Sequence, residues 1–273
     1  METKVAENSL RQTILDIGRR MYDKNFVAAN DGNISVRLDD ARILATPTGV
    51  SKGFMTSEEL VITDMKGNCL SPGKPSSELP MHLFILNERP DVNAVVHAHP
   101  PYATGFATAG IALDKCVLAE VIVTIGSVPL AAYGTPSTQE LPDSLKPYIH
   151  SHDAFLMANH GVVTVGKDLL DAYFKLERVE HSAKIIYLAR VLGGETILPA
   201  EAVKKLYDIR ETYGIEALNP GCYACHDECI GDACINHAVK FNPDAPDYFN
   251  QVVEKILRDV KPFFAGRKET QGG

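Results

Sequence analysis

Residues 91–99 read Asp-Val-Asn-Ala-Val-Val-His-Ala-His, and this stretch is the starting point for both the fold and the site. The apolar run at 94–96 predicts a strand that ends in His97 and His99. Side chains two positions apart on a strand point to the same face of the sheet. Both imidazoles are therefore expected on one face, where they can bind one metal ion.

A third histidine, His160, lies in a turn, Asn159-His160-Gly161, between strands predicted at 154–158 and 162–165. Three imidazoles that leave one coordination position open are typical of a catalytic zinc site. Cobalt or manganese can replace zinc among such ligands. A His-X-His pair is also common in proteins that bind no metal, so the interpretation depends on the residues that accompany it.

Further from this stretch, the apolar pattern predicts short strands joined by tight turns, with helices between them. The other predicted strands are 34–38, 43–46, 60–63, 120–125 and 128–132. The predicted helices are one capped by Ser9 and continuing to Met21, then 77–88, 102–109, 138–149 with an interruption at Pro142, 168–192, 199–213 and 245–260. Strands that follow one another through hairpin-like turns favour a mixed, largely antiparallel sheet covered by helices.

Composition excludes several classes of protein. The 273 residues carry a formal net charge of −8, which argues against a nucleic-acid surface. No apolar run approaches the roughly 20 residues needed to cross a bilayer. The first residues, METKVAENSLRQ, contain no apolar segment of a signal peptide. We therefore expect a cytoplasmic protein without nucleic-acid or membrane partners, whose six cysteines are reduced rather than paired in disulfides.

Three loops of small and polar residues could each hold a phosphate group: 30–33, 46–49 and 74–77. The last precedes a predicted helix, where serine hydroxyls and free N–H groups favour an anion. Each loop taken alone is better explained as a turn. Glu78 taken alone is better explained as a first-turn acid favoured by the helix dipole.

Taken together and in order, these segments resemble the motifs of the class II aldolase/adducin family. The matching residues are Gly32-Asn33, Thr48-Gly49, Ser76-Ser77-Glu78, His97-Ala98-His99 and Asn159-His160-Gly161. The resemblance covers residues 9 to 214. It implies an α/β fold, a three-layer α/β/α sandwich with a mostly antiparallel central sheet. It also implies a homotetramer with active sites between subunits.

The resemblance further implies roles for individual residues. The zinc ligands would be His97, His99 and His160. Glu78 would be the catalytic glutamate, which also binds the metal in the resting enzyme. The positions that bind the substrate phosphate match Asn33, Thr48, Gly49, Ser76 and Ser77. Tyr213 resembles a tyrosine that closes the site.

The reaction implied is cleavage of a ketose 1-phosphate into dihydroxyacetone phosphate and an aldehyde. In it zinc acts as a Lewis acid, and Glu78 exchanges a proton with the carbon beside the carbonyl. Family members that are pentulose-phosphate 4-epimerases carry aspartate where this chain has Glu78. A decarboxylase of a phosphorylated 3-oxo acid would use the same metal and glutamate and stays open as an alternative. An adducin-like scaffold domain is the alternative outside enzymes, but such domains have generally lost the metal histidines.

The sequence also departs from the family pattern. The aldolases use a tyrosine of the neighbouring subunit to protonate the leaving aldehyde, and Leu118 falls near that position here. Tyr133 and Tyr102 are candidates to replace it. The sugar itself stays open.

We expect a catalytic domain at residues 1–214 and a cysteine-rich extension with a terminal helix at 215–273. Four of its cysteines, spaced C-x2-C-x3-C-x4-C, could bind a second metal ion or remain free thiols. They are Cys222, Cys225, Cys229 and Cys234.

Overall fold

The protein is described here from a computed structural model, in which residues 2–212 are placed and all belong to one compact unit. Tyr213, the cysteine-rich extension and the helix expected at 245–260 lie outside these residues. Within residues 2–212, seven strands form one sheet in the order β3-β2-β1-β4-β7-β6-β5. The strands are β1 Asn33–Arg37, β2 Arg42–Ala45, β3 Val61–Asp64, β4 Ala94–Ala98, β5 Leu130–Ala131, β6 Ala154–Met157 and β7 Gly161–Gly166.

Neighbouring strands pair antiparallel throughout this sheet, except that β5 and β6 run parallel. The hairpins β1–β2 and β6–β7 were predicted from their turn residues, and β2 and β3 are also paired neighbours that follow one another in the chain. The mixed, mostly antiparallel sheet of an α/β fold is therefore confirmed.

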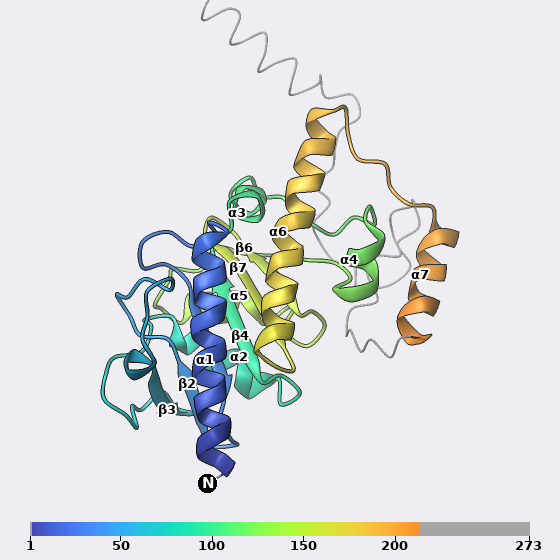
Figure 1. The fold of residues 1–273 in the computed structure, drawn as a ribbon. Coiled ribbons are helices and arrows are strands. Elements are labelled where there is room, and N and C mark those ends of the chain that lie inside the picture. Colours follow the sequence, from blue (N-terminus) through green and yellow to red (C-terminus); the bar gives the residue numbers. More distant parts are fainter. Residues whose placement is uncertain (1, 213–273) are drawn as a thin grey trace, which may run out of the picture. The chain divides into compact units, whose positions relative to one another are not determined.

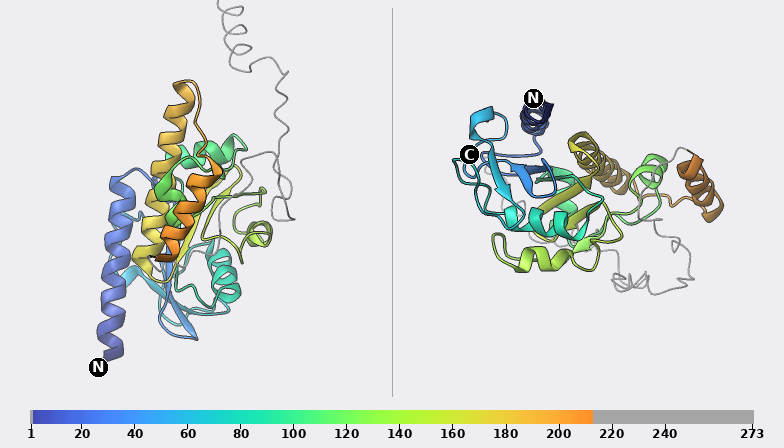
Figure 2. Two further views of the ribbon diagram at one scale, coloured as in Figure 1. Left: turned by 90° about the vertical axis from the view of Figure 1, so that its right-hand side faces the viewer. Right: turned by 90° about the horizontal axis from the view of Figure 1, so that it is seen from below.

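The helices are α1 Glu2–Asp23, α2 Leu79–Glu88, α3 Pro101–Thr108, α4 Ala119–Thr124, α5 Glu140–Leu145, α6 Leu169–Val191 and α7 Ala200–Thr212, with a 3-10 turn η1 at Ser57–Glu59. Figures 1 and 2 show α1 and α6 on one face of the sheet and α2 and α5 on the other. Two apolar cores match this arrangement. Ile17 of α1 and Leu176 of α6 pack with Val96 on one face, while Ile85 of α2 and Leu145 of α5 pack with Val95 on the other.

Most predicted helices begin and end within a residue or two of the expected bounds, but three expectations were wrong. Residues 120–125, predicted as a strand from Val-Ile-Val, form most of helix α4, whose Ile122 is buried with Val203 and Tyr207. This packing outweighs the preference of β-branched residues for strands. Ser9 does not cap α1, because nothing in residues 2–8 breaks a helix and α1 continues back to Glu2. Pro142 does not interrupt α5, because it lies in its first turn, where proline is tolerated.

The central strand β4 positions the site. Its His97 pairs with Asn33 of β1 on one side and with Val163 of β7 on the other. None of the described helices is long and apolar enough to span a membrane.

Candidate active site

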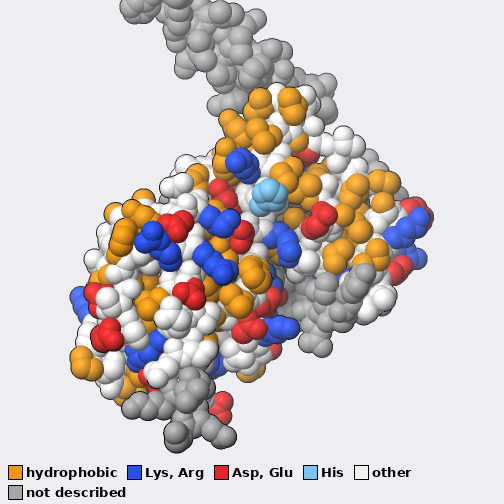
Figure 3. Space-filling model, in the orientation of Figure 1, with side chains coloured by type: hydrophobic (Ala, Val, Ile, Leu, Met, Phe, Trp, Pro, Cys, Tyr) orange, Lys and Arg blue, Asp and Glu red, His pale blue; other side chains and the backbone are white. Residues whose placement is uncertain are grey.

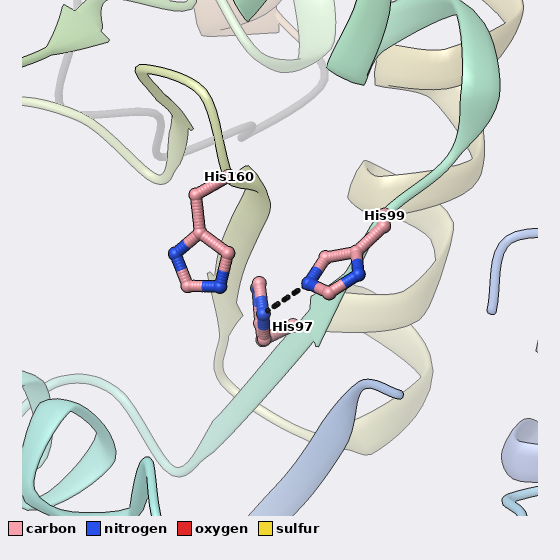
Figure 4. A group of neighbouring side chains, drawn as sticks. All are labelled: His97, His99 and His160. Atoms are coloured by element: carbon pink, nitrogen blue, oxygen red, sulfur yellow. Dashed lines mark hydrogen bonds between the residues drawn. The ribbon is translucent and has the colours of Figure 1, made fainter. Parts of the chain in front are cut away.

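Three histidines converge at one end of the β4–β7 pair. His97 is the fourth residue of β4, His99 follows the strand directly, and His160 lies in the β6–β7 turn. Because Ala98 pairs with Val162, that turn lies beside the end of β4. One ring nitrogen of each histidine lies within 4.8 Å of those of the others. The His-X-His pattern had predicted that His97 and His99 share a face of the sheet. Figure 4 shows the three rings pointing toward one another.

The contacts of the first two histidines show which nitrogen of each ring faces the centre. The Nδ1 of His97 lies 2.8 Å from the carbonyl oxygen of Val162, so this nitrogen carries the proton and donates it. The Nδ1 of His99 lies 3.4 Å from a carboxylate oxygen of Asp31. The Nε2 atoms of His97 and His99 lie 3.1 Å apart, so both rings are directed at the same centre.

Glu78 adds negative charge to the same place. It occupies the N-cap position of α2, with one oxygen 3.0 Å from Nε2 of His160 and the other 3.3 Å from Nε2 of His97. Burial would raise the pKa of Glu78, but the charge of His97 and the hydrogen bonds with both histidines outweigh it, so its pKa lies well below its ordinary value. The carboxylate is therefore ionised.

Burial and neighbouring charges also shift the pKa values of His97 and His99. Burial would lower the pKa of His97, but the charge and hydrogen bond of Glu78 outweigh burial and raise it. Burial, together with repulsion from His97 and His160, lowers the pKa of His99 to about 4. The site thus attracts positive charge, and its three imidazole nitrogens and one carboxylate are a ligand set that fits a divalent metal ion.

Asn33 contacts Glu78 directly. Its amide Nδ2 donates to Oε2 of Glu78 at 2.7 Å, and its Oδ1 is in hydrogen-bonding contact with Nε2 of His82. The other nitrogen of His82 lies 2.7 Å from the hydroxyl of Ser35. The amide of Asn33 is thus turned to the carboxylate. Its binding of the substrate phosphate, which the resemblance implied, stays a prediction.

The other residues expected at the phosphate lie in two loops that the structure brings together. The N–H of Thr48 donates to Lys74 O at 3.0 Å, and the N–H of Ser76 donates to Thr46 O at 3.1 Å. Thr48, Gly49 and Ser77 are exposed, and Ser76 is half-buried. The hydroxyl of Ser76 also accepts from the N–H of Glu78 at 3.3 Å, so these loops connect directly to the carboxylate. A small pocket between loops and site is lined by Asn33, Ile34, Ser35, Ala45, Thr46, Ser76, Leu79 and His82.

Sequence reasoning missed two buried residues. His82 could have been found, because it lies one helical turn after Glu78 and so shares its face of α2. Lys52 gave no signal, since a loop lysine ordinarily faces solvent. It is only 2% exposed, and its ammonium donates to Asn30 O at 2.9 Å and to Val50 O at 2.6 Å. Burial lowers the pKa of Lys52 to about 8, against the opposing charges of Asp31 and Glu78.

The tyrosines considered as proton donors differ in position. Tyr133 is 58% exposed and follows β5, which runs parallel to β6, the strand that leads to His160. Tyr133 therefore lies near the same sheet edge as the histidines. Tyr102 is in α3, with its ring against that of Tyr187. Leu118 occupies the N-cap position of α4.

Comparison with known proteins shows the family of this chain. Residues 12–187 match the family described as Class II Aldolase and Adducin N-terminal domain. An L-fuculose phosphate aldolase of Methanococcus maripaludis is 39% identical over 177 residues, which are 64% of this chain and 94% of that protein. A 3-oxo-tetronate 4-phosphate decarboxylase of Haemophilus influenzae is 36% identical over 182 residues, 65% of this chain and 86% of that protein. The solved structure of an L-fuculose 1-phosphate aldolase superposes with a TM-score of 0.69 at 30% identity, covering 74% of this chain and 96% of that one.

Fold, site and relatives together define a metal-dependent lyase. The chain belongs to the class II aldolase and adducin family.

Proposed function

We propose that this protein is a zinc-dependent aldolase that cleaves a ketose 1-phosphate into dihydroxyacetone phosphate and an aldehyde. The observation that carries the proposal is the placement of an ionised carboxylate, Glu78, against two of three converging histidines. His97, His99 and His160 would hold the metal, with Glu78 as an additional ligand in the resting state. When bound, Zn²⁺ supplies a Lewis acid that polarises the substrate carbonyl.

Side chains of the protein would supply the proton exchange and the phosphate binding. Glu78 exchanges a proton with the carbon beside the carbonyl, which is work for a carboxylate held within hydrogen-bond reach of that carbon. The hydroxyls of Thr48, Ser76 and Ser77, with Gly49 and the start of α2, bind the phosphate and so fix the reacting carbons relative to Glu78. The ammonium of Lys52, buried close to both loops, adds positive potential to a chain whose net charge is negative.

Decarboxylation of a phosphorylated 3-oxo acid is the second candidate. Relatives similar to this chain to nearly the same extent are named as aldolases and as 3-oxo-tetronate 4-phosphate decarboxylases. Both reactions leave negative charge on a carbon beside a carbonyl, and both need a metal ion and a proton-exchanging group there. The described residues fit either chemistry, so the substrate decides between them.

The proposal also covers the layers of the fold, the assembly of subunits and the C-terminal extension at 215–273. Helices on both faces of the sheet support the three-layer α/β/α sandwich expected from the family. Exposed apolar side chains gather near the C-terminal end of α6 (Figure 3), among them Leu188, Val191 and Leu192. They support contacts between subunits of a homotetramer. Tyr213 would close the site, and the extension at 215–273 would form a separate cysteine-rich region able to hold a second metal ion.

The test offers substrates of both kinds to the zinc-loaded full chain. Dihydroxyacetone phosphate is supplied with a panel of aldehydes and the products are identified by mass spectrometry. Phosphorylated 3-oxo acids are supplied in parallel and CO2 release is measured. We expect carbon–carbon bond formation in the first assay, abolished by His160→Ala. CO2 release without any aldol product would favour the decarboxylase, and neither activity with zinc, cobalt or manganese would contradict the proposed function.

A further inference from the structure

A line of buried polar side chains leads away from Glu78, beginning at Asn33, which pairs with His97 across β1 and β4. Asn33 and Ser35 are two residues apart on β1, so their side chains face the same way. Glu78 and His82 are four residues apart at the start of α2, so they also share a face. The two pairs meet side by side. Ser35 is 0% exposed, His82 1% and Asn33 4%, and all three line the small pocket beside the phosphate loops.

The proton positions in this line follow from what each group can do. An amide oxygen only accepts, so Oδ1 of Asn33 requires that Nε2 of His82 carry a proton. Burial lowers the pKa of His82 to about 3, which keeps the ring neutral and leaves its Nδ1 as an acceptor. The hydroxyl of Ser35 then donates to this Nδ1 over 2.7 Å. Each bond therefore determines the direction of the next.

The last hydrogen bond in the line, from Asn33 to Glu78, orients the carboxylate. With Oδ1 of Asn33 held by His82, its NH2 group must point at Oε2 of Glu78. The reversed amide would place two acceptor oxygens against each other at 2.7 Å. Oε2 is thus held by Asn33 while Oε1 faces His160, which fixes the rotation of the carboxylate. A carboxylate that exchanges a proton with carbon needs such a fixed direction.

We propose that His82 and Ser35 are positioning residues that orient Asn33 and, through it, the carboxylate of Glu78. The inference rests on the proposed function for the role of Glu78, but not for the hydrogen bonds themselves. Neither residue touches the three histidines in any contact described above. Their loss should therefore reduce the rate of the reaction without removing the metal ion or weakening substrate binding.

The kinetic test compares His82→Leu with His82→Gln in the zinc-loaded full chain. Gln can place an N–H where Nε2 of His82 lies, whereas Leu cannot. We expect His82→Leu to lower kcat on the order of 10²-fold, the lower end of a general acid–base contribution, with KM and zinc content unchanged. His82→Gln should recover most of this loss. A wild-type kcat in His82→Leu, a loss of zinc, a loss that falls on KM, or a His82→Gln variant no better than His82→Leu would each overturn the proposal.

A matched pair of serine variants controls for burial. Ser35→Ala removes the hydroxyl that donates to Nδ1 of His82. Ser182→Ala removes an equally buried hydroxyl, which donates to Val179 O within α6 at 2.9 Å. Ser35→Ala should lower kcat about tenfold, an order-of-magnitude loss for one positioning bond. Ser182→Ala should leave kcat unchanged, and equal effects of the two would overturn the proposal.

A spectroscopic readout separates this inference from the proposed function. The nitrogen shifts of ¹⁵N-labelled histidine report the tautomer of each ring, whatever the enzyme turns over, and His82→Gln assigns the signal. We expect the Nε2–H tautomer for His82 from pH 5 to 9. An Nδ1–H tautomer or a charged ring would overturn the proposal even in an active enzyme. The expected tautomer in a protein without lyase activity would contradict the proposed function alone.

Discussion

Glu78 is the single residue on which the proposed chemistry depends most. Glu78→Gln keeps the size of the side chain and removes its ability to take a proton. We expect the rate of hydrogen exchange at the carbon of dihydroxyacetone phosphate to fall by about 10²–10⁴, as for a lost general base, while zinc and phosphate binding persist. Deuterium incorporation followed by NMR measures this rate. Exchange at the wild-type rate would exclude Glu78 as the base.

At this scale the sequence predicted the residues better than their contacts. Strand periodicity predicted that His97 and His99 lie on one face of the sheet, and the structure brings them together with His160. The contact of Asn33 with Glu78 could not be predicted. It depends on how α2 packs over β1. Asn33 and Glu78 are 45 positions apart in the chain, and a local sequence pattern cannot predict a contact between such distant residues. The burial of Lys52 could not be predicted either, because it depends on a contact with Asn30, 22 positions away in the chain.

The paired strands β4 and β7 hold the histidines in place, and the close contacts at position 161 require a glycine there. A Cβ atom at this position would lie 2.5 Å from Ala98 O and 2.6 Å from the ring of His99. Gly161→Ala must therefore push the strands or the ring apart. We expect reduced zinc content and a fall in kcat on the order of 10²-fold, as for a displacement of about 1 Å in a site.

The control for this prediction is Gly105→Ala in α3, where an added Cβ meets nothing within 4 Å. Alanine in a helix interior should stabilise the protein by about 0.5–1 kcal/mol and leave zinc content and kcat unchanged. Zinc content and kcat are measured on both variants. Wild-type zinc content and kcat in Gly161→Ala would show that the close packing of β4 against β7 does not position the histidines.

Elements with a clear local pattern were predicted, and those decided by neighbours were not. The long helix α6 could be predicted because Asp168 caps it, accepting a hydrogen bond from Asp171 N–H, and Gly193 follows its end. Helix α4 could not, since its Val-Ile-Val run favours a strand and only the contact of Ile122 with α7 favours a helix. An element of six residues such as α4 carries too few positions for a helical period to appear.

For the molecule as a whole, buried neutral histidines predict loss of stability in acid. Burial lowers the pKa of His152 to about 4, from an ordinary value of 6.5. The unfolded chain therefore takes up a proton below pH 6.5 that the folded chain refuses until about pH 4. The stability that His152 contributes is fully present above pH 6.5 and is lost as the pH falls through this window. At pH 5 the loss is roughly 2 kcal/mol.

Urea unfolding of wild type and His152→Gln at pH 7.5 and pH 5 measures this loss. The variant lacks the titrating group, so its free energy of unfolding should fall less between the two values. His181→Gln, an exposed histidine on α6, is the matched control and should behave as wild type. An equal fall in wild type and His152→Gln would contradict the assignment to His152.

The central claim, that the three histidines hold the metal ion of a lyase, is tested most directly by metal content. Zinc per chain is measured by elemental analysis in wild type and in His99→Ala, purified side by side. Any metal held by the cysteine-rich extension is common to both proteins and cancels in the difference. The account predicts that wild type exceeds the variant by about one zinc ion per chain, as for a single catalytic site. Equal zinc content in two folded proteins would contradict it.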